Sequence, residues 1–475
     1  MNIVWLRRDL RVDDNSALLE AAKGNNPVVA VYIATPHTWQ EHDLAPIQAD
    51  FIYRRLFELQ KDLAALHIPL LYFEVDTFTK SADKVVELAQ ALKFEGVFIN
   101  KEYELNETRR DDYLDQRLSS LGKTLHRFDD KCIFPPGSVV NKQGAYFKVF
   151  TPFKKAYLSK LSQFPVHPKK AAQLACKADL GEYEGHVLTA DSPFSYPRVS
   201  SERYSVETKA IYDKLRAFND ETVERYKEER DFPAVDGTSG LSPYLTIGAL
   251  SVRQCMARVL YQQPLPLSLG RETWQSELIW REFYQHLTYF EPKLSMGKSF
   301  LPWGQALVWQ GDEKRIKAWK EGKTGYPIVD AAMKQLNQTG WMHNRLRMIV
   351  ASFLIKDLQV DWRVGEAYFM SKLIDGDYAS NNGGWQWCAS TGCDGQPYFR
   401  IFNPTTQGER FDPKGDFVRH WIPELASVPD KYIHQPWKYS NVNALSYSAP
   451  IVDHKAQREI TLANYKNAKD AMNAS

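Results

Sequence analysis

The chain has 475 residues, of which 44% are hydrophobic and 25% are charged. This composition is typical of a globular protein that is too long for one hydrophobic core, so we expect two or three domains. Its 60 basic and 58 acidic residues leave a net charge of +2, which excludes binding of nucleic acid or membranes by bulk charge alone. No apolar run approaches the roughly 20 residues of a membrane span. We expect a cytoplasmic protein with no signal peptide and no appended C-terminal tail.

Cysteine and tryptophan are distributed in informative ways. The five cysteines are spread along the chain without a Cys-x-x-Cys pair, so the sequence predicts neither a disulfide framework nor a zinc site, and we expect no metal. Eleven of the 13 tryptophans lie between Trp274 and Trp437, which separates two chemically different halves.

In the first 130 residues, short apolar runs alternate with amphipathic patterns. The predicted strands are residues 3–6, 28–33, 70–73, 96–99 and 124–128, and helices are predicted to begin near residues 15, 47, 81 and 107. This alternation predicts an α/β domain with a doubly wound parallel sheet. The first strand is followed by residues 7–15 without a G-x-G-x-x-G, so a dinucleotide bound at that turn has no support.

The rest of the chain divides into a connector and a helical part. Prolines and lysines are frequent over residues 131–205, which we interpret as an interdomain connector. From residue 206 to 475 the apolar spacing is helical, with Ser242 as a predicted N-cap before Pro243, a helix stop at Gly340 and a last helix over 456–471. The predicted domains are therefore 1–130, 131–205 and an all-helical 206–475.

One predicted helix carries an unusual set of side chains on one face. Spacings of three and four bring together Trp274, Glu277, Trp280, Arg281 and Tyr284. Two indoles beside a carboxylate and a guanidinium suit a pocket that stacks a flat ring and hydrogen-bonds its edge. A structural helix with two buried tryptophans and an exposed Glu/Arg pair is the alternative.

A second predicted helix covers residues 341–348, where Asn344, Arg347 and Met348 share a face and Arg345 points elsewhere. The face with Asn344 could bind a ligand, and the face with Arg345 could bind a phosphate. Alone, His343 is interpreted as a surface or capping histidine and Arg345 as a solvated charge.

Two further segments have ligand-binding character. Residues 375–387 combine acids, amides and glycines that let the backbone approach a ligand, although a calcium loop or a plain polar loop remain rivals. Residues 238–242 offer three hydroxyls and a glycine before a helix start, which suits a diphosphate, or Ser242 simply caps that helix.

These four segments, in this order, closely resemble the DNA photolyase and cryptochrome family, most of all the bacterial class I cyclobutane pyrimidine dimer photolyases. The resemblance begins with residues 4–11, VWLRRDLR, continues through 230–233 and 321–327, and is densest over 341–407. It implies light-dependent DNA repair, in which excited reduced FAD donates one electron to a flipped-out dimer and regains it. A cryptochrome-like blue-light photoreceptor without repair is the alternative. Repair of (6-4) photoproducts would call for a histidine pair where His343-Asn344 supplies one histidine, and a dark oxidoreductase would call for a nicotinamide fingerprint.

The resemblance also implies roles for individual residues, with one FAD per chain. The implied FAD contacts are Tyr226, Thr238, Ser239, Gly240, Leu241 and Ser242 toward the ribityl and diphosphate part, and Asn344, Arg347, Asp375, Gly376, Asp377 and Asn381 around adenine and isoalloxazine. Arg347 and Asp375 would form a buried ion pair. Asn381 would face flavin N5, where plant cryptochromes have an aspartate.

For the substrate, the resemblance implies three further sets of residues. The lesion pocket would comprise Glu277, Trp280, Asn344, Met348 and Trp387, and an electron relay would comprise Trp309, Trp362 and Trp385. Contacts to UV-damaged DNA would come from Arg230, Glu277, Trp280, Arg281, Tyr284, Arg345, Arg400 and Gln407, without reading sequence.

An antenna chromophore is implied for the N-terminal domain. His42, Asn106 and Glu107 match a site for 5,10-methenyltetrahydrofolate, whereas Ser295-Met296 stands where a Cys-Lys pair is expected. A deazaflavin, or no antenna, remains open. The family resemblance also predicts a monomer.

Overall fold

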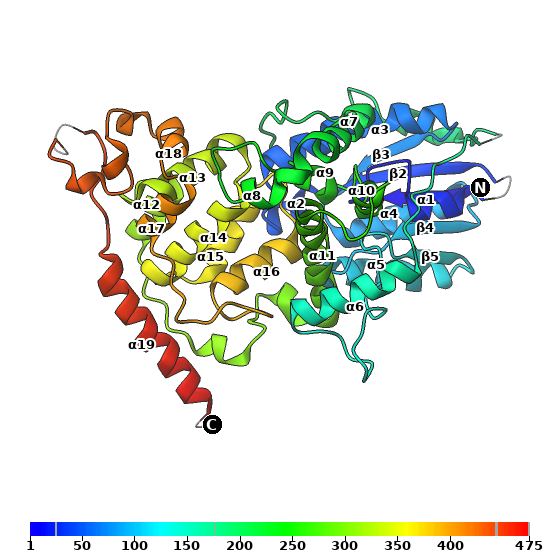
Figure 1. The fold of residues 1–475 in the computed structure, drawn as a ribbon. Helices are drawn as coiled ribbons and strands as arrows, with labels where there is room; N and C mark the ends of the chain where they lie inside the picture. Colours follow the sequence, from blue (N-terminus) through cyan, green and yellow to red (C-terminus); the bar gives the residue numbers. More distant parts are fainter. Residues whose placement is uncertain (24–25, 175, 442–444, 474–475) are drawn as a thin grey trace. The chain divides into compact units, whose positions relative to one another are not determined.

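A computed structural model describes residues 1–23, 26–174, 176–441 and 445–473. Its sheet consists of five parallel strands in the order β3-β2-β1-β4-β5 (Figure 1). The strands are β1 (Asn2–Leu6), β2 (Val28–Ala34), β3 (Leu70–Glu74), β4 (Gly96–Asn100) and β5 (Thr124–Phe128). All five strands predicted from the sequence are confirmed, as is the doubly wound parallel sheet.

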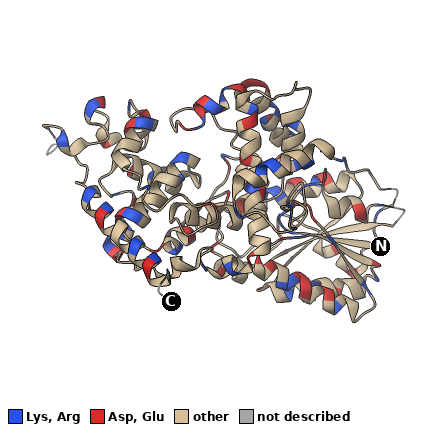
Figure 2. Ribbon diagram, turned by 60° about the horizontal axis from the view of Figure 1, so that its bottom comes forward, with Lys and Arg blue, Asp and Glu red and all other residues tan. Residues whose placement is uncertain are grey.

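Helices cover both faces of this sheet, which explains why its strands are almost continuously apolar. Successive side chains alternate between the faces, so Ile3, Trp5, Val29 and Val31 share one core with residues of α4 and α5. The helices α1 and α3 contact strands as well. Figure 2 shows the strands nearly free of charged residues, while the helices carry both signs.

The helices around the sheet begin within three residues of the predicted positions. They are α1 (Ser16–Ala21), α3 (Pro46–Ala65), α4 (Phe78–Ala91) and α5 (Leu105–Ser119). Asn15 caps α1, and its side chain accepts a hydrogen bond from Leu18 N. The six-residue α2 (Pro36–Glu41), which begins at a proline, was not predicted because it is too short for a periodic signal.

The segment interpreted as a connector contains a helix, α6 (Phe150–Gln163), and a 3₁₀ turn, η1 (Gly181–His186). Phe150, Phe153, Tyr157 and Leu161 form the buried face of α6, which contacts α11. The flanking prolines and the lysines on the opposite face hid this spacing. Aromatic residues of the segment therefore belong to a packed core.

After α6 the named elements are all helical in the described part of the chain. They are α7 (Thr208–Ala217), α8 (Tyr226–Glu229), α9 (Ser242–Thr246), α10 (Val252–Leu260), α11 (Leu269–Phe290), α12 (Glu313–Glu321), α13 (Pro327–Thr339), α14 (Asn344–Ser352), α15 (Trp362–Met370), α16 (Tyr378–Cys388), α17 (Pro404–Phe411), α18 (Asp416–Trp421) and α19 (His454–Asn473). Short turns are η2 (Phe218–Thr222), η3 (Val223–Arg225), η4 (Pro292–Met296), η5 (Pro302–Ala306), η6 (Phe353–Asp357), η7 (Pro423–Leu425), η8 (Asp430–Tyr432) and η9 (Pro436–Lys438).

The predicted helix signals have different outcomes. Gly340 ends α13 in the left-handed conformation with φ 69°, as predicted. The predicted N-cap at Ser242 is wrong, because Leu241 occupies that position and Ser242 begins α9. The predicted helix over 341–348 begins only at Asn344, after the cap His343.

The chain forms two compact units that are not continuous in sequence. The first unit comprises Met1–Glu224, Ser239–Pro292 and Ile374–Ala379, and the second comprises Arg225–Thr238, Lys293–Leu373 and Ser380–Ser475. Because this grouping differs from a division in chain order, the boundaries at residues 130 and 205 stay a prediction. Among the described helices, none combines the length and apolar character that a membrane span needs.

Candidate active site and antenna site

Helix α11 of the first unit presents a partly exposed stripe of the predicted residues. Trp274 is buried, whereas Glu277, Trp280, Arg281 and Tyr284 are half-buried. The alternative with two buried tryptophans therefore holds for only one of them. A large indole left partly open beside a carboxylate is available to a ligand.

The orientation of Trp280 is fixed by its neighbours in the first unit. Its ring stacks on Phe150 with centroids 3.6 Å apart and planes at 8°, and Tyr284 lies at 5.6 Å. Arg281 Nη1 donates to the carbonyl of Lys131 at 2.8 Å, which ties α11 to the segment after β5. Sequence reasoning missed Phe150, because no local pattern links it to a residue 130 positions away.

The loop at residues 374–377, in the same unit and just before α16, is held in place by side chains of two helices, α9 and α3. Ser242 Oγ donates to Asp375 Oδ2 at 2.6 Å, and Thr246 Oγ1 donates to the Asp375 carbonyl at 3.3 Å. Gln48 Nε2 donates to the carbonyls of Ile374 and Gly376 at 2.9 and 3.1 Å. The hydroxyl of Ser242 therefore supports this loop and caps no helix.

Asp377 lies in the same loop and is also held by buried partners. Gln285 Nε2 lies 3.1 and 3.2 Å from its two carboxylate oxygens, and Lys131 Nζ lies 3.7 Å from Oδ2. Lys131 also pairs with Glu104 at 2.7 Å. The two carboxylates of the loop are thus fixed in position before any ligand binds.

In the second unit, His343 caps α14. Its Nδ1 accepts a hydrogen bond from Arg345 N at 3.2 Å, so the capping interpretation is confirmed. The surface interpretation is wrong, because His343 is only 2% exposed. Burial, opposed in part by Asp231, lowers the pKa of His343 to about 4, so the ring is neutral at physiological pH. Its Nε2 has no hydrogen-bond partner among the described residues.

The side chains that follow His343 diverge, as predicted. Asn344 is exposed and Met348 is half-buried. Arg347 Nε donates to the Met342 carbonyl at 2.8 Å, whereas Arg345 pairs with Asp231 at 2.9 Å. Arg345 is therefore an ion-paired residue and not a freely solvated charge. The ion pair predicted between Arg347 and Asp375 joins residues of different units and stays a prediction.

Two other predicted contacts of this unit lie near each other. The Arg230 guanidinium lies 5.2 Å from the ring centroid of Tyr226, at the end of α8. A guanidinium over an aromatic face is weakly attracted to it and stays oriented. Gln407 lies on α17 and is half-buried, and Arg400 precedes that helix and is exposed.

Asn381 lies on a helix, α16, which overturns the polar-loop alternative for residues 378–387. Its Nδ2 donates to the Glu366 carbonyl at 3.0 Å, and the residue is 9% exposed. The neighbouring Asn382 donates to Glu366 Oε1 at 2.7 Å. Because its nitrogen is engaged, the carbonyl oxygen of Asn381 is the end that suits a ligand donor.

The three tryptophans predicted to form a relay share one core cluster of the second unit. Trp362 and Trp385 are 0% and 2% exposed, and Trp309 packs against the cluster from a partly buried position. A Cβ on Gly365 would lie 2.0 Å from Trp385 Cη2, so this indole contacts the backbone of α15 one turn from Trp362. Gln310 and Gly311 donate to the Gln359 carbonyl, which brings the Trp309 segment close to the start of α15.

One further tryptophan of this cluster was not singled out from the sequence. Trp319 is fully buried, and its ring centroid lies 6.1 Å from that of Trp385 in an edge-to-face arrangement. Its Nε1 donates to the Val350 carbonyl at 3.1 Å. Proximity alone therefore does not separate a relay tryptophan from a packing tryptophan.

The three predicted antenna residues come together in the first unit. Asn106 Nδ2 lies 2.9 Å from His42 Nε2, and His42 Nδ1 lies 3.9 Å from Glu107 Oε1. Burial lowers the pKa of His42. Burial, followed by repulsion from Glu104 and Glu102, raises the pKa of Glu107, which favours a carboxyl that can donate a hydrogen bond.

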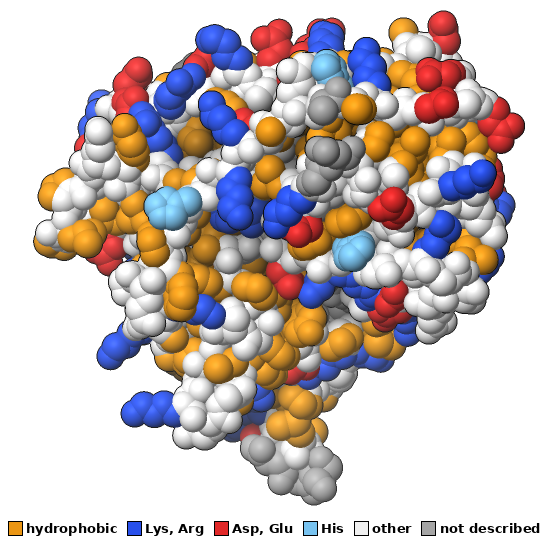
Figure 3. Space-filling model, turned by 90° about the vertical axis from the view of Figure 1, so that its right-hand side faces the viewer, with side chains coloured by type: hydrophobic (Ala, Val, Ile, Leu, Met, Phe, Trp, Pro, Cys, Tyr) orange, Lys and Arg blue, Asp and Glu red, His pale blue; other side chains and the backbone are white. Residues whose placement is uncertain are grey.

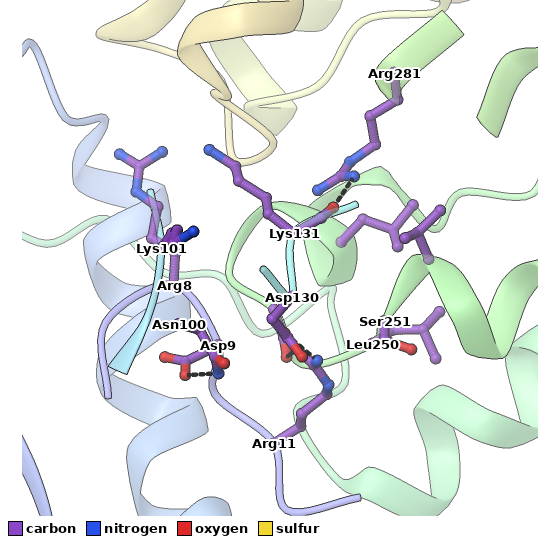
Figure 4. Close-up of a pocket in the computed structure, with 13 residues that line it drawn as sticks. Arg8, Asp9, Arg11, Asn100, Lys101, Asp130, Lys131, Leu250, Ser251 and Arg281 are labelled. Atoms are coloured by element: carbon purple, nitrogen blue, oxygen red, sulfur yellow. Dashed lines mark hydrogen bonds and ion pairs between the residues drawn. The ribbon is translucent and has the colours of Figure 1, made fainter. Parts of the chain in front are cut away.

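A small open cavity of about 30 Å³ lies at the carboxyl ends of β1, β4 and β5 (Figure 4). Five basic and two acidic side chains line it, namely Arg8, Arg11, Lys101, Lys131, Arg281, Asp9 and Asp130. Asp130 pairs with Arg11 and Arg253, and Arg11 Nε has no partner among the described residues. In doubly wound sheets, ligands bind at this edge where the strand order reverses, here between β1 and β4.

Charged side chains also occur on the surface and in one buried cluster of the first unit. Figure 3 shows basic, acidic and apolar side chains mixed over one face, in keeping with the small net charge. Cys132, Glu282 and His286 lie within 4.8 Å of one another in the core of the first unit. Glu282 accepts a hydrogen bond from Ile133 N at 2.8 Å, and His286 Nε2 lies 2.9 Å from the Phe134 carbonyl. Both side chains are therefore already hydrogen-bonded to the backbone.

Comparison with known proteins matches both parts of the chain to one family. The family model described as DNA photolyase matches residues 2–173, and the FAD binding domain of DNA photolyase matches residues 274–467. A Vibrio cholerae protein named deoxyribodipyrimidine photo-lyase is 57% identical over 99% of this chain and 100% of its own length. The Escherichia coli protein of the same name is 48% identical over 98% and 99%.

Solved structures agree in fold. A class III photolyase of Agrobacterium tumefaciens is 35% identical with a TM-score of 0.86 and covers 99% of this chain and 98% of that one. A Synechocystis cryptochrome has the same TM-score at 27% identity and covers 98% of each chain. The fold alone thus fits both kinds of protein, whereas the sequence matches extend over the full length of the named photo-lyases. On these grounds the chain belongs to the DNA photolyase family.

Proposed function

We propose that this protein is a light-dependent carbon-carbon lyase that repairs cyclobutane pyrimidine dimers in DNA. The observation that carries the proposal is the 57% identity to a deoxyribodipyrimidine photo-lyase over 99% of the chain. The partly exposed stripe of Glu277, Trp280 and Tyr284 on α11 supports it, because it offers flat and hydrogen-bonding surfaces to two flipped-out pyrimidines.

The residues present fit FAD. In the first unit a Cβ on Gly240 would lie 3.1 Å from Lys214 Nζ, so an ammonium accompanies the hydroxyls proposed for the diphosphate. In the second unit a Cβ on Gly384 would meet no atom within 4 Å, which leaves open space beside the buried Asn381. The proposed contacts are Tyr226, Thr238, Ser239, Gly240, Leu241, Ser242, Asn344, Arg347, Asp375, Gly376, Asp377 and Asn381. The chemistry that bound, reduced FAD supplies is light-driven donation and recovery of one electron.

The chain's own residues supply binding and selectivity. Trp280 and Trp387 would pack on the extruded pyrimidines beside Asn344 and Met348, and Glu277 would hydrogen-bond a base edge. Flipping bases out of a duplex costs a few kcal/mol, and this cost is lowest for a lesion that is already poorly stacked. Asn381 is neutral, so its Oδ1 can accept from a protonated ring nitrogen without repelling an anionic ring.

Two other groups of residues complete the proposal. Trp385, Trp362 and Trp309 would carry an electron from the surface for photoreduction. Arg230, Arg281, Tyr284, Arg345, Arg400 and Gln407 would contact DNA, and phosphate contacts position a duplex without reading its sequence. We therefore expect binding that is independent of sequence and weakens steeply with salt.

For the antenna, we propose 5,10-methenyltetrahydrofolate at His42, Asn106 and Glu107, with the missing Cys-Lys pair lowering its affinity. The basic lining of the small cavity in Figure 4 supports a second candidate, a chromophore whose phosphate would bind there. An archaeal photolyase of Sulfolobus tokodaii, 30% identical with a TM-score of 0.82, is described with two FAD molecules. Absorption spectra of purified Glu107→Ala and Lys101→Ala variants separate the two sites, because only the occupied site loses its chromophore.

We propose a monomer that acts in the bacterial cytosol, where its DNA substrate lies. Light scattering during gel filtration measures the mass of the particle, and a dimer would contradict this part. Fractionation of cells that express the chain measures its location.

The proposed activity is tested with UV-irradiated plasmid DNA and reduced protein, in blue light and in the dark, with lesion-specific antibodies as the readout. We expect dimers to disappear only in the light and (6-4) photoproducts to persist. If both lesions persist in the light, the chain is a photoreceptor without repair activity.

A further inference from the structure

The ammonium of Lys356 is buried in the second unit and forms no ion pair with a carboxylate of the described residues. Lys356 lies on η6 and is 0% exposed. Its Nζ donates to Ser390 Oγ at 3.2 Å and to the Arg400 carbonyl at 3.1 Å, and it lies 5.8 Å from the Tyr465 ring centroid. Within the described residues, all its hydrogen-bond acceptors are neutral.

Stability does not explain this lysine. A buried charge costs several kcal/mol unless an opposite charge offsets it, and an apolar side chain of similar volume is often as stable or more so. Burial lowers the pKa of Lys356 to about 8, against the opposing influence of Cys388 and Asp357. The cation is thus held at neutral pH at a cost to folding.

The two acceptors lie at either end of one irregular segment. Ser390 follows the end of α16, and Arg400 precedes α17, with neither helix nor strand between them. Inside this segment, Thr391 O accepts from Leu301 N at 2.8 Å and Arg400 N donates to the Pro397 carbonyl at 2.9 Å. Lys356 therefore joins both ends of the segment through one ammonium.

The side of η6 that faces α19 is equally fixed. Thr461 Oγ1 donates to the Lys356 carbonyl at 2.6 Å, and His454 Nδ1 lies 2.5 Å from Asp357 Oδ1. Tyr465, also on α19, donates to the Ala389 carbonyl at 2.9 Å. The lysine thus projects from a backbone that α19 holds in place.

We propose that Lys356 is a positioning residue for DNA binding, which fixes the backbone of Arg400 so that its exposed guanidinium meets a phosphate. This inference rests on the proposed function, in which Arg400 contacts DNA. The guanidinium reaches into solvent from an irregular segment, so its placement depends on the carbonyl that Lys356 holds.

The test compares Lys356→Met with Arg400→Gln in the full-length holoprotein, with a duplex that carries one dimer. Because Met fills a similar volume without a charge, we expect the Tm of Lys356→Met to be unchanged or higher, while the Kd rises about tenfold, the scale of one charged hydrogen bond. The logarithm of the DNA association constant falls with the logarithm of the salt concentration, and each variant should make this slope shallower by about one. For Lys356→Met, repair per flash at saturating DNA, and photoreduction, should stay unchanged.

A double-mutant cycle decides whether the lysine acts through the arginine. If it does, Lys356→Met with Arg400→Gln binds DNA no more weakly than Arg400→Gln alone. The inference is overturned if the Kd of the double variant rises by the product of the two single fold-changes. It is also overturned if the Kd of Lys356→Met equals that of the unaltered protein.

If Lys356→Met does not fold, Ser390→Ala removes one acceptor and leaves the charge. We then expect faster amide hydrogen exchange over 390–400 and a higher Kd, with exchange in α14 unchanged; an unchanged Kd overturns the inference. Failure of the proposed function is distinguishable, because the unaltered protein would then show no preference for damaged over intact duplex.

Discussion

Helix α11 of the first unit and the tryptophan cluster of the second unit are both rich in aromatic residues, yet they differ in exposure. On α11, Trp280 is half-buried beside Glu277, with its ring orientation set by Phe150. In the cluster, Trp362 and Trp385 are almost fully buried, and Trp309 lies nearer the surface. The first arrangement leaves a ring surface open to the proposed substrate, and the second encloses most of the proposed electron relay away from water.

This difference places the partly exposed Trp280 where a ligand can reach its ring, whereas Trp362 and Trp385 are enclosed in a core. It also separates the two light reactions of the proposed function. Loss of a tryptophan proposed for the relay should affect photoreduction and spare repair by reduced protein, and loss of a lesion-pocket residue on α11 should do the reverse.

The largest expected effect is on photoreduction. Trp309→Phe should abolish photoreduction of oxidised flavin, because the surface end of the relay is lost, while repair by chemically reduced protein continues. Flash absorption spectroscopy measures the first reaction and dimer loss the second. Trp319→Phe is the matched control, since Trp319 also contacts Trp385 and should leave photoreduction intact. Photoreduction that survives in Trp309→Phe would remove this residue from the relay.

The next effect is on repair. Glu277→Ala should lower repair by about 10- to 100-fold, because a hydrogen bond to a charged group contributes about 1.5–3 kcal/mol. FAD absorbance should stay unchanged. Glu272→Ala, an exposed acid on the same helix, is the control with the same charge change. Equal repair rates for both variants would take Glu277 out of the pocket.

A smaller effect concerns the packing of the cluster. Gly365→Ala should lower the free energy of unfolding by about 1–3 kcal/mol, because the added methyl group overlaps the Trp385 ring. Denaturant unfolding measures the change, with Gly384→Ala as the control in open space. Equal stability of the two variants would contradict the close contact between α15 and Trp385.

The last effect depends on pH and concerns Glu282, which lies on the buried side of α11. Burial raises its pKa from 4.5 to about 7, so the folded state binds its proton more tightly than the unfolded state. The stability contributed by this proton is complete below pH 4.5 and is lost as pH rises to about 7. Glu282→Gln should therefore gain up to about 3 kcal/mol relative to the unaltered protein between these values. If the free energies of unfolding of Glu282→Gln and the unaltered protein change in parallel with pH, the raised pKa of Glu282 is contradicted.

Much of the fold follows from sequence because local patterns determine it. Strand runs in a covered parallel sheet are continuously apolar, and Gly340 marks a helix end through its left-handed conformation. Helix α6 was hidden by prolines and lysines around its apolar spacing. The discontinuous units could not be predicted, because residues 374–379 join the first unit through Gln48, Ser242 and Gln285, contacts that no local pattern encodes.

The candidate site divides in the same way. The stripe on α11 was found because helical spacing alone places its members together, and His42, Asn106 and Glu107 were found by resemblance. Phe150, Lys214 and Lys356 were missed, since each acts through a partner far away in sequence. His343 was assigned its cap correctly but not its burial, which depends on tertiary packing.

The most direct test of the account is repair of an oligonucleotide with one thymine cyclobutane dimer by purified, prereduced protein, followed as recovered thymine absorbance. We predict recovery in blue light and none in the dark, with the same yield for Trp309→Phe and a strongly reduced yield for Glu277→Ala. No recovery in blue light, from protein shown to hold reduced FAD, would contradict the assignment of α11 to a lesion pocket.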